Sequence, residues 1–409
     1  MPADVPRPAP SRRRVLVGTA AVTTTCVFPS FLLGAMAVQV RRDLGFSELG
    51  IGLGFGAFFL AASLSSVVLG RVAERAGPVR SLRVAAVVSG TACLAVAVAA
   101  RDLPTLILLL AVAGTANALC QPAANLLIAR ELPAHRQGLG FAVKQSAIPT
   151  ATLLAGAAVP ALALTVGWRW AFVAAAGLSV ATALTVPPVV SPPLASRAAP
   201  GGRGVDVPVR VLAVLSIGIG FGAASGGTLG SFLVSGAVDA GISEGGAGLL
   251  LTAGSLVGIT VRLGAGVQAD RRDGRHLVVV TRMLLGGAVA YALLATESVA
   301  GYLVAGPLGF ATGWAFPGLF NLAIVRANPA RPAAATGITQ TGTYFGAVAG
   351  PLLFGAIAEA SSYRVAWSVA AAFALVSAAA IVAGRRCLIA WKAAQPPATE
   401  PVTDPLPSV

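Results

Sequence analysis

Twelve apolar stretches, most of them about 20 residues long, limit what this 409-residue chain can fold into. A helix needs about 20 mainly apolar residues to cross a hydrocarbon core of about 30 Å. The stretches are continuous rather than alternating, and each must satisfy its own backbone hydrogen bonds in lipid, which favours helices over a β-barrel. Their approximate cores are residues 15–38, 49–69, 82–100, 104–128, 138–164, 170–190, 209–235, 247–269, 277–296, 299–325, 335–358 and 365–384.

We therefore predict an all-α membrane protein with twelve transmembrane helices. Its residues are 56% hydrophobic and only 11% charged, far from the balance of a soluble domain. A polar segment rich in Pro and Gly separates the sixth stretch from the seventh. The predicted division is a cytoplasmic arm at 1–14, a six-helix bundle at 15–190, a cytoplasmic linker at 191–208, a second six-helix bundle at 209–386 and a disordered cytoplasmic tail at 387–409.

The net charge of +14 is distributed as in a membrane protein and does not indicate a nucleic-acid-binding surface. If the N-terminus lies in the cytoplasm, nearly all of the 29 Lys and Arg residues fall on the cytoplasmic side. This asymmetry is the positive-inside rule, and it predicts a multi-pass protein of the cell membrane with both termini inside. The basic residues are scattered among loops and tails, so no continuous strip for nucleic acid is expected. The exceptions are Arg41, Arg42, Arg101, Arg169 and Arg364.

The two halves of the chain repeat each other at an offset of about 195 residues, as parallel transporter repeats do. "GRVAER" from Gly70 matches "GVQADR" from Gly266, and "PAANLLIAR" ending at Arg130 matches "PGLFNLAIVR" ending at Arg326. We therefore predict two pseudo-symmetric bundles. Parallel repeats of this kind place a binding site at their interface near the bilayer midplane.

The repeated charged loops resemble the signature of the major facilitator superfamily, Gly-x-Leu-Ala-Asp-Arg-x-Gly-Arg-Arg. The "GWRWAF" that starts at Gly167 is also common in that family. The resemblance implies the twelve-helix fold of these transporters and a latch between the halves. The latch residues are Gly70, Glu74, Arg75 and Gly77 in the first copy and Gly266, Asp270, Arg271, Gly274 and Arg275 in the second.

By resemblance, the latch carboxylates accept hydrogen bonds from a helix N-terminus in the opposite half. Glu74 would meet the start of the 335–358 helix, and Asp270 the start of the 138–164 helix. A helix N-terminus carries about half a positive charge, so an anion there gains roughly 0.3 to 1 kcal/mol. The contact would form in one conformation and break in the other. The alternative is a purely topogenic charge cluster.

Two cations enter the predicted helices, and no acid lies deep within any of them. Lys144 and Arg262 come from different halves and lie roughly 10 Å inside the cytoplasmic face. Charges inside a membrane are costly and indicate function, so the pair is a candidate clamp for a small anion. The alternative is that Lys144 extends towards the interface and that Arg262 supports the loop at Asp270.

Polar and aromatic residues supply weaker candidates for substrate contacts. Asn117, Gln121 and Asn125 recur at a spacing of four and share one helix face. Each candidate could equally form a hydrogen bond between helices. The remaining candidates are Thr25, Phe28, Gln145, Thr228, Trp314, Gln340 and Tyr344.

The predicted function is secondary transport of a small anionic or neutral polar solute by rocker-switch alternating access. "KQSAIPTATLLAG" from Lys144 is similar to permeases of the cyanate-permease-like branch, and the arginine usual in drug and proton antiporters is Leu110 here. Export of a drug-like compound is the alternative. The Cys and His residues show no metal-binding spacing, and there is no intramembrane acid pair, so we expect no cofactor, no metal and no enzyme. We expect a monomer in the lipid bilayer, with a coupling ion left open.

Overall fold

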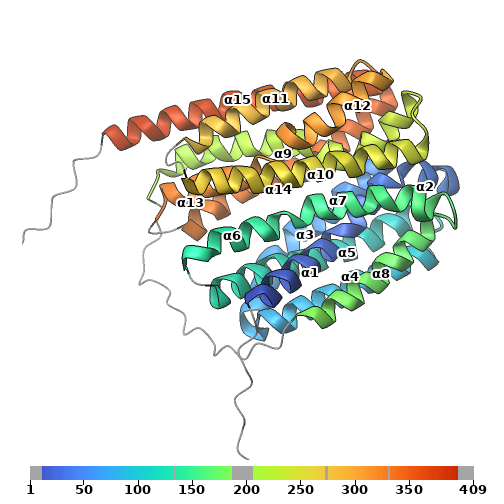
Figure 1. Ribbon diagram of the computed structural model, residues 1–409, viewed down its shortest axis with the longest axis horizontal. Helices are drawn as coiled ribbons and strands as arrows, with labels where there is room; N and C mark the ends of the chain where they lie inside the picture. Colours follow the sequence, from blue (N-terminus) through green and yellow to red (C-terminus); the bar gives the residue numbers. More distant parts are fainter. Residues whose placement is uncertain (1–11, 133, 187–205, 272–274, 330–331, 395–409) are drawn as a thin grey trace, which may run out of the picture.

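The computed structural model describes residues 12–132, 134–186, 206–271, 275–329 and 332–394. Most of the predicted arm, most of the linker and the end of the tail therefore lie outside the described residues. The described residues form helices that run in two opposite directions through one elongated bundle (Figure 1). We call the end that carries Arg12 and Ala393 the terminal end, and the opposite end, with the short helix α2 (Ala37–Leu44), the distal end.

The first half folds into helices that match its six predicted stretches, with one addition and one division: the stretch predicted as one helix at 138–164 is divided after Gln145 and again after Ala158. A short helix, α2, follows the first span and carries Arg41, Arg42 and Asp43; the hydropathy pattern did not predict it. The elements are α1 (Arg12–Ala35), α2 (Ala37–Leu44), α3 (Glu48–Ala76), α4 (Pro78–Ala99), α5 (Leu103–Glu131), α6 (Ala134–Gln145), α7 (Ala147–Ala158), the π-helical turn η1 (Val159–Ala163) and α8 (Trp168–Thr185).

The second half repeats this arrangement. Its fourth span, predicted as one helix at 299–325, is interrupted after Pro307, whose ring lacks an N–H and removes one helical hydrogen bond. The last helix also runs to Ala393, beyond the predicted end at 384. The elements are α9 (Val209–Asp239), α10 (Glu244–Arg271), α11 (His276–Leu294), α12 (Val299–Leu308), the π-helical turn η2 (Gly309–Gly313), α13 (Pro317–Ala327), α14 (Pro332–Ala360) and α15 (Tyr363–Ala393).

Eleven of the described helical segments are long and apolar enough to cross a membrane. The remaining predicted span is α8, a helix of 18 residues that begins with the polar or amphipathic Trp168, Arg169 and Trp170. Large apolar side chains cover the exterior, with Leu64 75% exposed and Leu184 82% exposed, as a hydrocarbon surrounding requires. The described residues contain no strand. The prediction of an all-α membrane fold with paired bundles is confirmed.

The buried core is continuous at the distal end and divided at the terminal end. One cluster contains residues of both halves, from Phe31 and Phe55 to Phe232 and Trp367. Towards the terminal end, each half instead packs around a separate cluster of its own, one in the first half and one in the second. The two halves are therefore joined at the distal end and have separate cores at the terminal end.

Glycines let the halves approach closely at the distal end. A Cβ added to Gly156 would lie 2.5 Å from the carbonyl oxygen of Gly248, and one added to Gly248 would lie 2.7 Å from that of Gly156. Contacts this short exclude a side chain. Three helix pairs meet in this way: α1 with α9 at Gly34 and Gly230, α3 with α14 at Gly52 and Pro351, and α7 with α10 at Gly156 and Gly248. The repeat relates α1 to α9, and it relates the α3–α14 pair to the α10–α7 pair.

We predict that Gly248→Ala destabilises the protein although Ala favours a helix more than Gly does. The new methyl group would meet backbone and the Val159 side chain, and overpacking of this kind costs about 1–3 kcal/mol. The measurement is the thermal unfolding midpoint of the purified protein. Gly264→Ala, in the same helix, is the matched control because a Cβ there meets no atom within 4 Å. Equal midpoints for the two variants would contradict the close approach.

Candidate functional site

A polar face of α5 meets the end of α6 inside the first half. Gln121 Nε2 donates to Asn117 Oδ1 over 3.1 Å, and Lys144 Nζ donates to Asn125 Oδ1 over 3.0 Å. The lysine is 6% exposed, whereas Asn125 is exposed. The predicted spacing of four therefore does place the three α5 residues along one line, and Lys144 joins it.

Arg262 of α10 lies across the boundary between the halves. Its Nη1 donates to the backbone carbonyl of Gln145 over 3.0 Å, and its Nη2 donates to the backbone carbonyl of Trp314. Gln145 belongs to the first half and Trp314 to the second. The guanidinium thus joins the two halves, and Lys144 is the chain neighbour of the residue it binds.

Helix breaks explain why these two carbonyls need a donor. Pro149 has no N–H, so the Gln145 carbonyl four residues earlier lacks its usual helical partner. Trp314 follows η2 and precedes α13, where the regular helical pattern is interrupted. A freed carbonyl inside a bilayer must be satisfied by the protein, and Arg262 does this at both breaks.

The two cations keep donors that no described residue uses. Arg262 Nε is buried and has no hydrogen-bond partner, and Lys144 Nζ makes one of the three hydrogen bonds that an ammonium can make. Neither cation forms an ion pair with any described residue. A buried ammonium and a half-buried guanidinium therefore lie near the boundary of the halves, and no carboxylate of the described residues balances them.

Aromatic rings pack on the distal side of this site. The Trp314 ring lies edge to face with Phe31 of α1 at a centroid distance of 5.6 Å, and 5.4 Å from Phe310. Phe31 is a contact that the sequence did not suggest, because Phe28 was the ring selected there. Phe28 is buried in the same shared core, but no ring contact joins it to Trp314 among the described residues.

Other candidates lie apart from the two cations. The Thr25 hydroxyl bonds Thr182 of α8 over 3.2 Å, and the Thr228 hydroxyl donates to the Ser225 carbonyl over 2.6 Å within α9. Gln340 and Tyr344 are half-buried on α14, and neither side chain has a hydrogen-bond partner among the described residues. Arg262 thus joins Gln145 to Trp314, and Lys144, the chain neighbour of Gln145, binds Asn125; Asn117 and Gln121 bind each other farther along α5.

The Glu74 half of the predicted latch is not formed in this conformation, and the Asp270 half lies outside the described residues. Glu74 and Arg75 are exposed at the end of α3, and Glu74 has no hydrogen-bond partner among the described residues. Gly77 follows with a φ of +86°, a left-handed conformation that favours glycine. Gly70 and Gly266 lie in open surroundings, and Arg275 is exposed before α11. The side chains of Asp270 and Arg271, and all of Gly274, lie outside the described residues.

Carboxylates join the halves at the distal end instead. Glu359, near the end of α14, accepts hydrogen bonds from Ser47 Oγ over 2.5 Å and from the Leu49 N–H over 3.2 Å, at the N-terminus of α3. Glu244 accepts from Gln39 Nε2 over 2.7 Å and from Arg42 Nη2 over 2.8 Å. A carboxylate at a helix N-terminus of the other half is the type of contact that the sequence predicted for the terminal end.

A separate contact stabilises the distal end within the first half. Asp43 accepts hydrogen bonds from Arg169 and, over 3.0 Å, from Trp168 Nε1. Slight burial raises the pKa of Asp43, but these hydrogen bonds outweigh it and hold the pKa below its ordinary value. The carboxylate is therefore ionised throughout the physiological range.

We predict that Glu244→Gln with Glu359→Gln opens the distal end, because neutral amides lose the charge-assisted bonds across the halves. The measurement is the distance between spin labels on Arg101→Cys and Ala300→Cys in a Cys387→Ser background. The other three cysteines are buried. We expect a larger fraction of molecules to show a long distance between the two labels.

The matched control is Glu297→Gln, because Glu297 pairs with Arg364 within one half. An unchanged distance in the double variant, or an equal change in the control, would contradict a role for Glu244 and Glu359 in closure.

Comparison with known proteins places this arrangement in a family. The family model described as Major Facilitator Superfamily matches residues 19–211 and 215–405. A solved structure of a bacterial homologue of the human lysosomal transporter Spinster, in an inward-facing and occupied conformation, is similar, with a TM-score of 0.72, 15% identity and coverage of 93% of this chain and 98% of that chain.

A second structure of a bacterial Spinster homologue, inward-facing and unoccupied, gives a TM-score of 0.70 at 16% identity, with 93% of this chain and 99% of that chain covered. At this identity the likeness shows the fold. No curated protein matches the chain. Because the family match extends over both halves and the fold agrees with it, this chain belongs to the major facilitator superfamily.

Proposed function

We propose that this protein is a secondary transporter that carries a small anion, such as a carboxylate, across the cell membrane by rocker-switch alternating access. Membership of the family makes it a membrane transporter, and the two cations are the reason for proposing an anion as the solute. The single observation that carries the proposal is the pair Lys144 and Arg262 near the boundary of the halves. Lys144 is buried, Arg262 is half-buried with its Nε buried, and neither has an ion-pair partner among the described residues.

An anion would complete this site in a way that a neutral or apolar solute would not. Burying an uncompensated charge in a membrane protein is costly, and a substrate carboxylate would offset that cost while it is bound. Because the terminal nitrogens of Arg262 already bind carbonyls, the anion would meet its Nε and the remaining N–H groups of Lys144. The two terminal nitrogens that could bind a carboxylate bidentately are therefore engaged by the protein itself.

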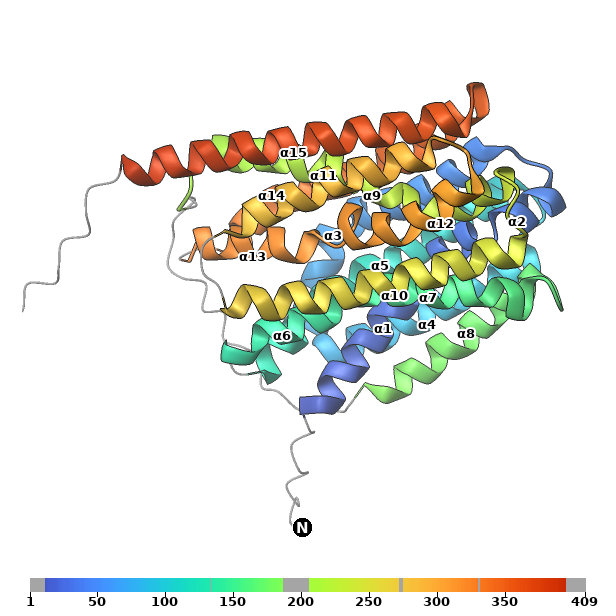
Figure 2. The same cartoon turned by 45° about the horizontal axis from the view of Figure 1, so that its top comes forward.

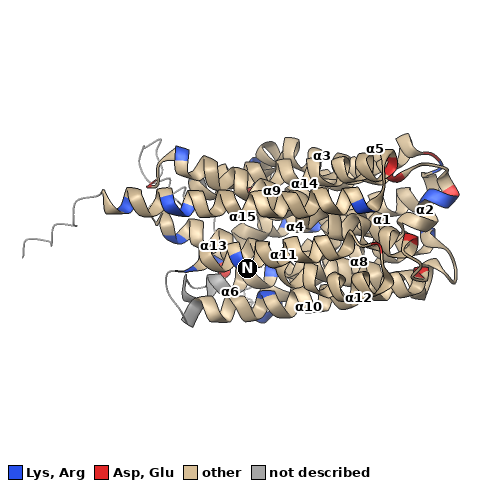
Figure 3. Ribbon diagram, turned by 90° about the horizontal axis from the view of Figure 1, so that it is seen from above, with Lys and Arg blue, Asp and Glu red and all other residues tan. Residues whose placement is uncertain are grey.

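The charge distribution supports an orientation with the terminal end in the cytoplasm. Lys and Arg residues gather at the terminal end, whereas most of the acids lie at the distal end, where they are mixed with arginines (Figure 3). By the positive-inside rule, the described conformation is then closed towards the outside, with separate cores towards the cytoplasm. This is the arrangement in which a solute would reach the site from within.

Export of a drug-like compound, the alternative from the sequence, finds less support. A hydrophobic compound would need an apolar surface and no balancing charge, so two unpaired buried cations would be a cost without a use. The likeness to the cyanate-permease-like branch stays a prediction, as do the coupling ion and the monomeric state. We infer transport rather than catalysis.

We predict that Lys144→Gln and Arg262→Gln each lower the uptake of a transported carboxylate into proteoliposomes by about tenfold or more, because losing a buried charge partner commonly costs 2–5 kcal/mol. The probes are radiolabelled acetate, lactate and succinate. Lys144→Arg, which keeps the charge, should retain part of the uptake. Arg101→Gln, an exposed arginine at the distal end, is the control.

Folding of each variant is checked separately by its thermal unfolding midpoint. A carboxylate that binds the native protein raises that midpoint, and the two neutral variants should lose the increase. Unchanged uptake in both variants, or no carboxylate uptake by the unmodified protein, would overturn the anion proposal.

We also propose that Glu74 and Asp270 form the latch in the opposite conformation, with Glu74 at the N-terminus of α14 and Asp270 at that of α6. Glu74→Gln should then disfavour closure of the terminal end. The measurement is the distance between spin labels on Arg80→Cys and Val279→Cys, with and without substrate. Glu131→Gln is the control. Equal substrate-dependent closure in Glu74→Gln and in the unmodified protein would argue against the latch.

A further inference from the structure

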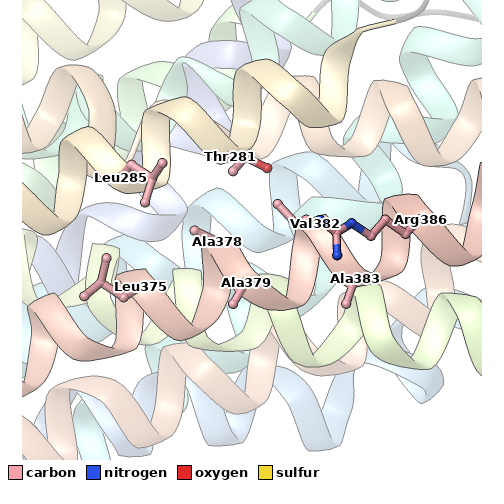
Figure 4. Close-up of a pocket in the computed structure, with 8 residues that line it drawn as sticks. All are labelled: Thr281, Leu285, Leu375, Ala378, Ala379, Val382, Ala383 and Arg386. Carbon is pink, nitrogen blue, oxygen red and sulfur yellow. The ribbon is translucent and has the colours of Figure 1, made fainter.

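A groove on the outer surface of the second half is not part of the site between the halves. It lies between α11 and α15, which run along one edge of the bundle (Figures 1 and 2). Its volume is about 420 Å³. Six of the residues that line it are Thr281 and Leu285 of α11 and Leu375, Ala379, Val382 and Arg386 of α15 (Figure 4).

Small side chains on α15 produce the hollow. Ala379 and Ala383 are one helical turn apart and lie on the same wall of the groove, with Ala378 beside them. Larger apolar residues flank this stretch, and Leu285 is 46% exposed and Leu375 51% exposed. The groove therefore opens towards the hydrocarbon that surrounds the bundle.

The groove runs from an apolar end to a charged end. Leu375 lies deep in the span, and Arg386 lies just beyond the predicted end of the last apolar stretch, on the side of the terminal end. The part of α15 between them is about 16 Å long at 1.5 Å per residue. This is about half of a 30 Å hydrocarbon core, which is the depth of one leaflet.

Arg386 has no partner in the part of the chain that the structure describes. It is exposed, forms no ion pair or hydrogen bond with any described residue, and its guanidinium points back along the groove towards Val382 (Figure 4). Arg385 precedes it in the chain and also lacks an ion pair with the described residues. A guanidinium presents several N–H donors that suit the oxygens of a phosphate.

We propose that this groove binds one anionic phospholipid, with the headgroup phosphate at Arg386 and an acyl chain along the alanine wall. A phosphate supplies the charge that complements Arg386, and a chain fills an apolar groove of leaflet depth. With the terminal end in the cytoplasm, the lipid belongs to the cytoplasmic leaflet, where basic residues attract anionic lipids.

The experiment measures lipid retained by the full-length purified protein in native mass spectrometry. The probes are dioleoylphosphatidylglycerol, dioleoylphosphatidylcholine and water-soluble glycerol phosphate. We expect phosphatidylglycerol to be retained in preference to phosphatidylcholine. Arg386→Gln should weaken phosphatidylglycerol binding about fivefold, the effect of one basic residue near an anionic lipid.

Ala379→Phe, which fills the groove without changing the charge, should weaken binding as well. The controls are Arg80→Gln, which removes an exposed charge of the first half, and Ala372→Phe, which adds the same bulk at an exposed α15 position outside the groove. Both controls should bind phosphatidylglycerol like the unmodified protein.

Three results would overturn the proposal: equal retention of the two lipids, unchanged binding in Arg386→Gln and Ala379→Phe, or displacement of the lipid by glycerol phosphate at similar concentration. The last result would identify a site for free phosphate. The readout needs no transported solute, so its failure would leave the anion-transport proposal standing.

Discussion

Inside a bilayer, every backbone carbonyl that a helix break sets free must find a donor within the protein. Two such carbonyls, at Gln145 and Trp314, receive their donors from one guanidinium, that of Arg262. The breaks belong to different halves, so the same side chain that completes the backbone also fixes a positive charge at their boundary. The neighbouring Lys144 adds a second charge. The site for an anion thus follows from satisfying the backbone where the spans are interrupted.

The α3 and α14 pair shows how the two ends of the bundle are related. The helices run antiparallel, because Gly355 near the end of α14 lies against the start of α3 and Gly52 lies against Pro351. Glu359 binds the N-terminus of α3 at the distal end. Glu74 has the equivalent place near the end of α3 and faces no partner in this conformation. In our proposal, rigid helices exchange one carboxylate contact for the other as the halves rock.

Hydropathy and the internal repeat predicted the class of fold and most of the spans, because lipid imposes the same length and polarity on each of them. They did not predict α2, which is short and carries charges, or the pairings of Glu244 and Glu359, which depend on the conformation. At the site, the sequence identified Lys144 and Arg262 because buried charges are rare in membrane spans. It could not identify the Arg262 acceptors, since Pro149 reveals a freed carbonyl but not the helix that supplies its donor. Phe31 was missed because apolar patterning does not distinguish one buried ring from another.

The central claim is that the two halves close at one end at a time. Its most direct measurement records two spin-label distances, 101 to 300 at the distal end and 80 to 279 at the terminal end. The protein is in lipid nanodiscs, with and without a transported carboxylate, and the residues that join its halves are unchanged. The account predicts reciprocal populations, so that any increase in the long distal distance is matched by a decrease in the long terminal distance. Long distances at both ends together, or two distances that vary independently, would contradict it.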